Sequence, residues 1–387
     1  MDMDESQSYL DHAATTFPRP PEVLDTMLAQ FAAMGCSPGR GGYDMAVEAE
    51  AFVQGVRQRL ASFFEAVRSD RVVFAANATD ALNLAIFGLA RPGIHVVSTR
   101  LEHNSVLRPL YHLQQIGRIE YTLVDFDSSG FVDPDDIAAS LQPNTGLVVI
   151  NHASNVLGSV QPIGAIGRIC AQNGIPLLID TAQSAGHVPI HMTAWNVSAL
   201  AFTGHKALLG PTGIGGLVTA PDVDIAPTRF GGTGVDSHSL SQPRFFPQRL
   251  EAGTLNMLGI MGLNAGLDYV EKIGLPENRD REMRLLSRLH QKLSAIEGVT
   301  VYGSFPDGRY VPVLSCNIAN VQPHDAGTIL DGDYGIAVRA GLHCAPLVHE
   351  DLGTSPHGAV RISLGWNTTE TDIDRAVTAI ADMGATR

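Results

Sequence analysis

The feature that most constrains this chain is an alternation of short apolar runs with helix-like segments, which begins near residue 70. Seven runs are candidate strands: RVVF (71–74), HVVST (95–99), IEYTLV (119–124), GLVVI (146–150), PLLID (176–180), ALAFT (199–203) and GGLVTA (215–220). Several are continuous and rich in β-branched residues, as is typical of strands covered on both faces. Helical patterns at 80–90 and 162–174 separate them. The alternation therefore predicts an α/β domain with a mostly parallel seven-stranded sheet.

The pattern changes after residue 260, where two long amphipathic helices are expected at 260–274 and 277–296. Short strand patterns and a last helix follow, at 299–303, 313–320, 359–365 and 370–383. A chain of 387 residues is long for one domain, so two domains are expected. We predict a large α/β domain at 20–260 and a smaller α+β domain at 261–387 that also includes residues 1–19.

Charge and cysteine content restrict the functional class. Lys+Arg 26 against Asp+Glu 40 gives a formal net charge of -14, which repels nucleic-acid phosphates and anionic lipid. No apolar run approaches the ~18 residues of a membrane span, and the start, MDMDESQSYL, has no apolar core of a secretory signal. Four scattered cysteines do not form a disulfide framework. These features predict a soluble cytoplasmic protein that binds neither nucleic acid nor membrane.

Ligands of open α/β sheets bind beyond the carboxyl ends of the strands. The segments that follow the predicted strands hold a set of residues able to bind a ligand through side chain or main chain: Asn77, Ala78, Thr79, His103, Asn155, Asp180, Thr203, His205 and Lys206. These residues are far apart in the sequence, and the predicted topology brings them to one edge of the sheet. We therefore expect the functional site at this edge.

Lys206 and Asp180 are the most informative members of this set. Lys206 follows an apolar strand and precedes apolar residues, so partial desolvation would lower the pKa of its amine and make it nucleophilic. An ordinary solvated loop lysine is the alternative. Asp180 ends the most hydrophobic strand, where a carboxylate is costly unless a cation or a donor meets it. The protonated pyridine nitrogen of pyridoxal phosphate is such a partner. A helix N-cap is the other interpretation, and it is compatible with the first.

A phosphate-binding turn is the third component. RVVFAANATDALNLAI is typical of a strand, a tight turn and a helix, whose first amides near Ala78 and Thr79 would favour an anion. Thr203, His205 and Thr254 supply further donors. Capping of the helix by the Thr79–Asp80 pair is the simpler alternative for the same residues.

Together these segments resemble the class V family of pyridoxal-phosphate enzymes, and most closely the cysteine desulfurases and selenocysteine lyases of the short-loop type. The matching segments keep the family's order from residue 9 to residue 374: YLDHAATT, NATDALNLAI, EHNSVL, SNVLGSVQPI, IDTAQSAGH, TGHKALLGPTGIGGL, EAGT, RAGLHCA and VRISLGWNTTETDID. The resemblance implies the fold type I of pyridoxal-phosphate-dependent transferases. It also implies a homodimer, in which each subunit completes its partner's phosphate site.

The resemblance implies roles for the cofactor-binding residues. Lys206 would hold pyridoxal 5'-phosphate in a Schiff base, Asp180 would pair with the pyridine nitrogen and Gln183 would meet the phenolic oxygen. His103 would stack on the ring and move protons, and Asn155 would bind the ring or the substrate carboxylate. The phosphate would be held by Ala78, Thr79, Thr203, His205 and, across the dimer interface, Thr254.

It also implies a substrate-binding set. Arg361, in VRISLG, would clamp the α-carboxylate of L-cysteine in a bidentate pair, which lysine does poorly. His12 and Ala14, in YLDHAATT, would lie at the substrate mouth, and His12 stands where we expect asparagine or serine in the family.

Cys344, in RAGLHCA, is the residue that the resemblance makes the sulfur acceptor. Its thiolate would take the substrate sulfur as a persulfide and leave L-alanine. A thiolate is required because the thiol is a poor nucleophile, and a cation such as Arg339 would favour it. His343 is adjacent, but neighbours in an extended segment point in opposite directions, so we do not assign it as a base.

Other interpretations of the cysteines are simpler. Cys36, Cys170 and Cys316 are expected to be ordinary small buried residues. A metal site built from His343, Cys344 and His349 fits no compact zinc spacing, so no metal is expected.

The first functional hypothesis is a cysteine desulfurase that passes persulfide sulfur to an acceptor protein, for iron–sulfur clusters or another sulfur-transfer pathway. Selenocysteine lyase activity is a close variant. A class V aminotransferase, epimerase or kynureninase-like lyase would keep the cofactor and not use Cys344. A silent scaffold that binds a partner is the third possibility, and the intact set of Lys206, Asp180, His103 and Arg361 argues against it.

Overall fold

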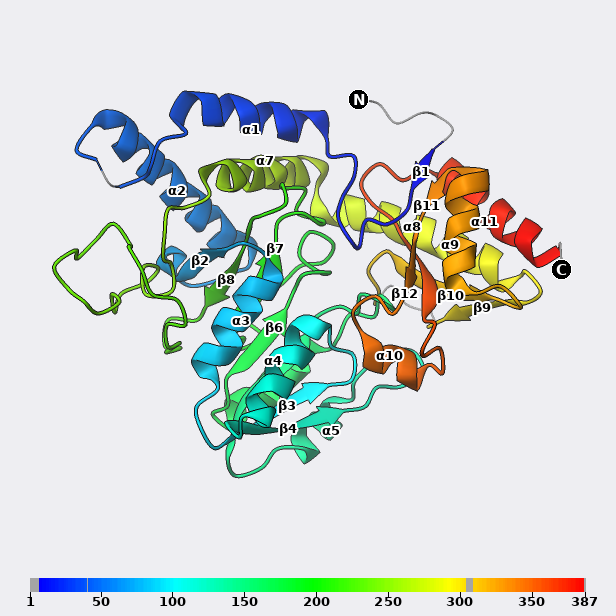
Figure 1. Cartoon of the computed structure of the whole chain (residues 1–387), viewed down its shortest axis with the longest axis horizontal. Coiled ribbons are helices and arrows are strands. Elements are labelled where there is room, and N and C mark those ends of the chain that lie inside the picture. Colours follow the sequence, from blue (N-terminus) through cyan, green and yellow to red (C-terminus); the bar gives the residue numbers. More distant parts are fainter. Residues whose placement is uncertain (1–6, 40, 304–308, 386–387) are drawn as a thin grey trace.

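The computed structural model describes residues 7–39, 41–303 and 309–385, and its larger part is built on a seven-stranded sheet (Figure 1). The strands are β2 (Val72–Ala75), β3 (Ile94–Thr99), β4 (Ile119–Val124), β5 (Thr145–Asn151), β6 (Leu177–Asp180), β7 (Ala199–Thr203) and β8 (Gly215–Thr219). All seven predicted strands are confirmed, and no end is displaced by more than one residue.

The strand order β2-β8-β7-β6-β5-β3-β4 confirms the expected mostly parallel sheet. Only β8 runs against its neighbours, β2 and β7. The four parallel pairs β3/β4, β3/β5, β5/β6 and β6/β7 therefore place their carboxyl ends along one edge. The segments that follow these strands begin at that edge.

Helices cover both faces of this sheet, which is why its strands are continuous apolar runs. On one face lie α2 (Asp44–Phe63), α6 (Ile163–Gln172) and α7 (Met257–Ile273), and on the other lie α3 (Ala78–Leu89) and α4 (Asn104–Gln115). Strand β6 shows the alternation, since Leu177 and Ile179 join the first buried cluster while Leu178 joins the second. Helix α5 (Pro134–Ala139) and a short 3₁₀ turn, η1 (Ser69–Arg71), complete this part.

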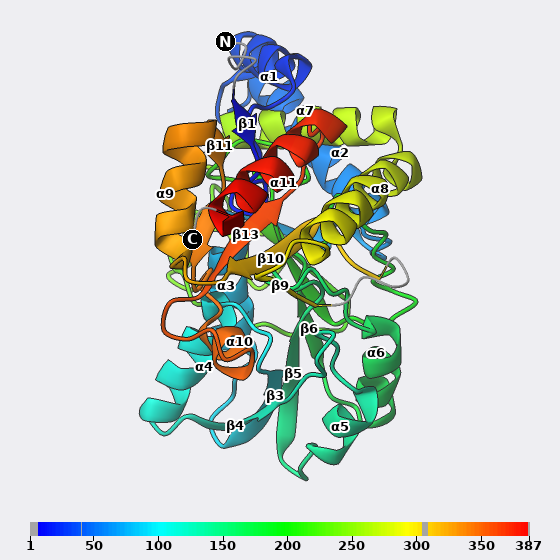
Figure 2. The ribbon, with the colours of Figure 1, turned by 90° about the vertical axis from the view of Figure 1, so that its right-hand side faces the viewer.

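The smaller part has an antiparallel sheet with strand order β12-β13-β10-β9 (Figure 2). Its strands are β9 (Val299–Tyr302), β10 (Val313–Ile318), β12 (Arg339–Gly341) and β13 (Ala359–Ser363). Helices α8 (Leu275–Ser294), α9 (Pro323–Tyr334) and α11 (Glu370–Ala385) share one buried cluster with this sheet. The short helix α10 (Pro346–Asp351) lies between the cysteine segment and β13. A small α+β part after the large sheet agrees with the expectation.

The N-terminal segment connects the two parts. Strand β1 (Ser8–Tyr9) pairs with β11 (Ile336–Ala337), and Leu10 joins the smaller cluster. A few residues later the main-chain N–H of Thr16 donates to the carbonyl of His205 at 2.9 Å, so the chain has crossed to the large sheet. Helix α1 (Pro21–Met34) then packs on α7.

The buried clusters indicate where one core gives way to the other. Helix α7 contributes Ile260, Leu263 and Leu267 to a cluster of the large sheet, whereas α8 contributes its leucines to the smaller one. The cores therefore change at the α7–α8 junction, near Gly274. The division into 20–260 and 261–387 stays a prediction.

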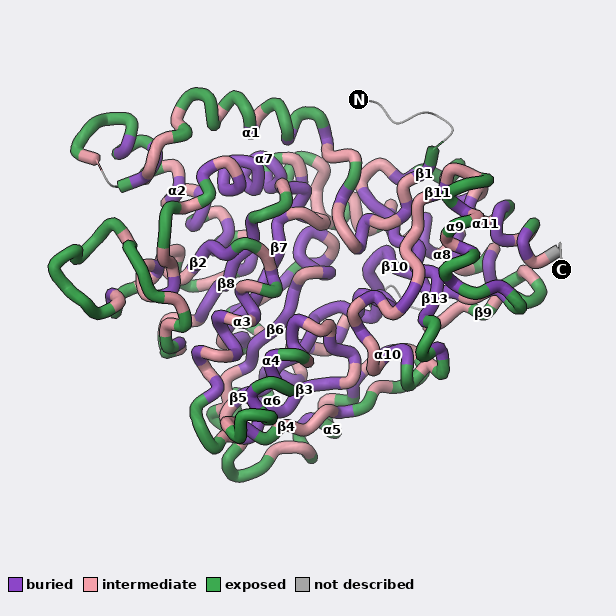
Figure 3. The backbone as a smooth tube through the Cα atoms, viewed as in Figure 1, coloured by how far each residue is buried: buried purple, intermediate pink, exposed green. Residues whose placement is uncertain are grey.

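Much of the segment between β8 and α7 is exposed (Figure 3). Residues 220–256, all of them described, form no regular strand or helix. Their exposed apolar side chains include Phe230, Leu240 and Phe245. No helix among the described residues is long and apolar enough to cross a membrane.

Candidate active site

A cavity of about 270 Å³, measured as the space open to the centre of a water molecule, lies at the carboxyl edge of the large sheet. Most of the predicted site residues line it: Ala14, Ala78, Thr79, His103, Asn155, Asp180, Gln183, Thr203, His205, Lys206 and Arg361. They come from both parts of the chain. The predicted topology thus gathers these residues into one cavity, while the role of each remains a proposal.

Lys206 follows β7 and faces this cavity, so water reaches part of its side chain. Desolvation by the surrounding protein lowers the pKa of its amine to about 8, and the charges of Arg361 and Arg339 act in the same direction. The Asp180 carboxylate opposes this shift. At pH 7 an amine with such a pKa is neutral in roughly a tenth of the molecules, far more often than an ordinary lysine, which suits a nucleophile.

Asp180 is the last residue of β6 and is almost completely buried. Burial raises the pKa of its carboxyl, while a hydrogen bond from the main-chain N–H of Ala182 (2.8 Å) and the charge of Lys206 act in the other direction. This carboxylate has one main-chain donor and a free face on the cavity. It fits the place of a partner for a protonated ring nitrogen.

His103 caps the N-terminus of α4. Its Nδ1 accepts from the main-chain N–H of Ser105 at 3.1 Å, so the neutral ring carries its proton on Nε2. Burial, with the charges of Lys206, Arg339 and Arg361 acting in the same direction, lowers the pKa of His103 to about 4. The imidazole is therefore neutral at physiological pH, with a proton on Nε2 that it can donate.

The N-terminus of α3 opens into the same cavity through Ala78 and Thr79. Its first amides have no intrahelical partner and favour an anion. Nearby, Thr203 Oγ1 is buried and has no hydrogen-bond partner among the described residues, although it lines the cavity. Gly215 permits its strand to approach Asn77 at the N-terminus of α3, since a Cβ at Gly215 would lie 2.9 Å from Asn77 Cα. An orphaned hydroxyl beside a helix N-terminus fits the phosphate of pyridoxal phosphate.

Arg361 lies in the centre of β13, is almost completely buried, and approaches the cavity from the smaller part. Its Nη2 donates to Asp11 Oδ1 at 2.7 Å and its Nη1 to the carbonyl of Asn155 at 3.1 Å. Arg339 lies directly opposite on β12 and also lines the cavity. Two guanidinium groups at one mouth, with a single carboxylate on Arg361, leave positive charge for an anionic substrate group.

Cys344 lies in the segment that joins β12 to α10 and is half-buried. Its Sγ is 3.7 Å from Nη2 of Arg339. Cys344 is not among the residues that line the cavity, but Arg339 and His343 are. The thiol is therefore next to the cavity wall and beside a cation.

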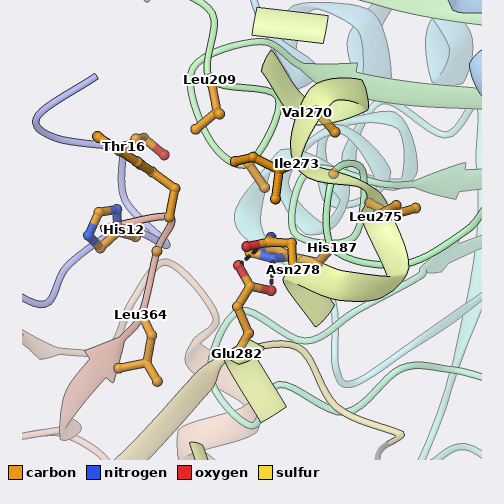
Figure 4. Close-up of a pocket in the computed structure, with 14 residues that line it drawn as sticks. His12, Thr16, His187, Leu209, Val270, Ile273, Leu275, Asn278, Glu282 and Leu364 are labelled. Atoms are coloured by element: carbon orange, nitrogen blue, oxygen red, sulfur yellow. Dashed lines mark hydrogen bonds and ion pairs between the residues drawn. The ribbon is translucent and has the colours of Figure 1, made fainter. Parts of the chain in front are cut away.

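Two predicted residues lie elsewhere. His12 lines a second, smaller cavity, with the side chains of His187, Asn278 and Glu282 (Figure 4). Neither ring nitrogen of His12 has a hydrogen-bond partner among the described residues, and burial lowers its pKa to about 3. Thr254 is exposed in the segment before α7 and does not line the cavity.

Sequence reasoning missed three residues close to the site. Asp11 binds the guanidinium of Arg361, and its place in YLDHAATT was the available signal. Ser105 links two cavity residues, with its Oγ 2.7 Å from Thr79 Oγ1 and 2.8 Å from His103 Nδ1. Glu102 is fully buried below the cavity, and burial raises the pKa of its carboxyl to about 8. Its position next to His103 in the sequence did not indicate that its carboxyl would be buried with a raised pKa.

Comparisons with known proteins show the family to which the chain belongs. The sequence model of the family described as "Aminotransferase class-V" matches residues 8–376. A probable cysteine desulfurase from Methanothermobacter thermautotrophicus is 37% identical over 97% of this chain and 95% of its own length. A cysteine desulfurase from Yersinia pseudotuberculosis is 33% identical over 96% and 92%. The apo structure of a cysteine desulfurase from Thermococcus onnurineus NA1 superimposes with a TM-score of 0.91, at 31% identity over 98% and 95% of the two chains.

The seven-stranded sheet and these structural relatives define a chain with the fold of the pyridoxal-phosphate-dependent transferases. More narrowly, the chain belongs to the aminotransferase class-V family, whose members depend on pyridoxal phosphate.

Proposed function

We propose that this chain is a pyridoxal-phosphate-dependent cysteine desulfurase, which converts L-cysteine to L-alanine and keeps the sulfur as a persulfide on Cys344. The relatives with that name, at 33–37% identity over nearly the whole chain, support the proposal. The observation that carries it is the placement of Cys344, beside Arg339 at the wall of a cavity that contains Lys206 and Asp180.

The residues of the large sheet would hold the cofactor. Lys206 would bind its carbonyl carbon, Asp180 its ring nitrogen, and Gln183 its phenolic oxygen, while His103 would cover the ring. The helix α3 N-terminus, with Thr79 and Thr203, would hold the phosphate, and His205 would assist. When bound, the cofactor supplies an electron sink that weakens the bond between Cβ and sulfur of the amino acid.

The substrate side would be served by the smaller part of the chain. Arg361, fixed by Asp11 and the carbonyl of Asn155, would hold the α-carboxylate of the amino acid. His103, which belongs to the large part and is neutral with its proton on Nε2, would donate that proton to a substrate carbon. The Cys344 thiolate would then attack the substrate sulfur, so that an S–S bond forms as the Cβ–S bond breaks. Protonation at Cβ, and return of the proton that was removed from Cα, would complete L-alanine.

We propose that a second copy of this chain covers the exposed segment 220–256. This segment presents Phe230, Leu240 and Phe245 to solvent, and such a patch favours a partner. The N–H of Gly253 donates to the carbonyl of Gly232 at 2.8 Å, which ties the neighbour of Thr254 to the base of the patch. A homodimer would thereby bring Thr254 to the partner's phosphate site. Sedimentation that shows only monomer with cofactor bound would contradict this role for Thr254.

An acceptor protein is the further partner that we propose, because a persulfide on a half-exposed cysteine has to be passed on. L-Cysteine is the proposed small-molecule substrate, and a cytoplasmic location remains a prediction from composition.

The test uses purified protein with pyridoxal phosphate, L-cysteine and a thiol reductant, and quantifies alanine and sulfide for wild type and for Cys344→Ala. We expect equal amounts of both products from wild type and a nearly complete loss in the variant. A cofactor spectrum that responds to amino acids, with no sulfide from either protein, would move the function to another class V reaction. Repeating the assay with L-selenocysteine would show whether lyase activity on selenium is the faster reaction.

A further inference from the structure

The turn that carries Cys344 has an unusual backbone. His343 and Cys344 both have positive φ angles, 50° and 57°, in the region that favours glycine. A side chain in this region costs on the order of 1 kcal/mol or more for each residue. Two such residues in succession require surrounding contacts that hold the turn in place.

Two of these contacts come from the large domain and hold the two carbonyl groups of the turn. Asn155 Nδ2 donates to the carbonyl of His343 at 2.6 Å, and the main-chain N–H of Asn104 donates to the carbonyl of Cys344 at 2.7 Å. Within the turn, the N–H of Ala345 donates to the carbonyl of Leu342 at 2.9 Å. The main chain on both sides of the thiol is thus fixed.

A chain of two imidazole rings supports the turn from the other side. His343 Nε2 lies 3.3 Å from the carbonyl of Arg339, and His343 Nδ1 lies 3.2 Å from His349 Nε2. His349 Nδ1 lies 2.8 Å from Thr354 Oγ1. Because a carbonyl can only accept, His343 donates from Nε2 and accepts at Nδ1. His349 therefore donates from Nε2, and its Nδ1 accepts from the hydroxyl of Thr354.

Both rings are neutral at physiological pH, as this pattern requires. Burial lowers the pKa of His349 to about 4 and that of His343 well below its ordinary value, where the charges of Arg361 and Arg339 add to the effect. Neither nitrogen of His343 is left for the sulfur of Cys344. The ring is thus a support and not a base.

The contact of His343 with the main chain also fixes Arg339, the cation beside the thiol. The carbonyl that His343 holds belongs to Arg339, whose Nη2 is 3.7 Å from Sγ of Cys344. Loss of the histidine contacts would therefore release both Arg339 and Cys344 from their positions.

We propose that His343 and His349 are positioning residues for Cys344: they hold the left-handed turn so that its sulfur stays beside Arg339. The inference rests on the proposed function, in which Cys344 is the attacking group. Its test concerns the reactivity of the thiol and is independent of whether the chain releases sulfide.

The test compares His349→Leu with His349→Gln in the cofactor-loaded protein. A glutamine amide can still donate to His343 Nδ1, whereas leucine cannot. Cys36 was expected to be buried but is partly exposed, unlike Cys170 and Cys316, so it is replaced by serine in all samples. The rate of Cys344 alkylation by iodoacetamide is measured against pH. In the same samples, the change of the cofactor spectrum on addition of L-cysteine reports on the rest of the site.

We expect His349→Leu to slow alkylation near neutral pH by about tenfold, while the spectral response is kept. His349→Gln should stay within about threefold of wild type. An unchanged alkylation profile in His349→Leu would overturn the proposal. So would a parallel loss of the spectral response, since His349 would then support the whole site.

Thr354→Val is the second variant, in case His349→Leu does not fold. It removes the hydroxyl that lies 2.8 Å from His349 Nδ1 and 3.3 Å from the His349 carbonyl, and we expect alkylation to slow by roughly threefold. No effect in a folded Thr354→Val protein would contradict the ordered ring chain. If wild type makes no sulfide but the alkylation differences persist, the proposed function fails and the positioning role stands.

Discussion

The two sides of the cavity are built in different ways. Asp180 ends a buried parallel strand, where sheet register fixes it, since Asn151 pairs with Asp180 and Asp180 with Ala201; Lys206 follows the end of the neighbouring strand β7. Cys344 stands on an irregular turn, held by a few hydrogen bonds from Asn155, Asn104 and the histidine pair. The groups that would hold a cofactor are therefore rigid. The group that would accept and pass on sulfur is held by contacts that can be released.

The largest effect should come from the rigid side. Lys206→Ala removes the amine that would bind the cofactor, and we expect the rate of alanine formation to fall by at least about 10³-fold. The absorbance of bound cofactor should change with it. Circular dichroism serves as the control for folding. Activity within tenfold of wild type would contradict the assignment of Lys206.

Asp180→Asn tests the same side with a nearly isosteric change. Asparagine cannot keep a ring nitrogen protonated, so we expect the rate to fall by about 10²-fold or more. The carboxylate of Asp180 also raises the pKa of Lys206, so the variant should move the pH midpoint of amine reactivity below that of wild type. An unchanged midpoint would show that the two groups are not coupled.

Arg361→Lys addresses the substrate side. A lysine keeps the charge and loses the fork that meets a carboxylate, so KM for L-cysteine should rise by about tenfold or more, with a smaller change in kcat. The spectrum of the bound cofactor without substrate should stay as in wild type. A fall in kcat alone would place Arg361 in the chemical step and would weaken the division between the two sides.

The smallest effect is expected from Glu102→Gln, which changes a buried carboxyl on the rigid side. Its Oε1 accepts from Asn151 N (2.9 Å) and Thr99 Oγ1 (2.8 Å), while Oε2 is buried and has no partner among the described residues. Burial raises the pKa of Glu102 from 4.5 to about 8, so the folded protein keeps a proton that the unfolded chain loses. The contribution of Glu102 to the free energy of unfolding is complete below pH 4.5 and is lost as the pH rises toward 8.

Urea unfolding across that pH range measures this effect. Glutamine imitates the protonated carboxyl, so the variant should lose this part of the pH dependence and equal or exceed wild-type stability near neutral pH. A variant that is clearly less stable at neutral pH would show that Glu102 is ionised in the fold.

The fold and the cofactor side were largely accessible from sequence, because both depend on local patterns. Continuous apolar runs located the seven strands, and the rule for strand ends led to Asp180 and Lys206. The support of Cys344 was not accessible, since the ring contact of His343 with His349 depends on a left-handed turn that the sequence does not reveal. His12 was expected at the substrate mouth. It lines a different, smaller cavity, where Gly365 lies against its ring.

The most direct test of the division between a cofactor side and a sulfur side is mass spectrometry of Cys344 after one turnover. Cofactor-loaded protein is mixed with L-cysteine without reductant, quenched with an alkylating agent and digested. We expect the peptide that contains Cys344 to gain one sulfur atom in wild type, and Lys206→Ala to leave it unmodified. Alanine formation without added sulfur on Cys344, or with sulfur on another cysteine, would contradict the account.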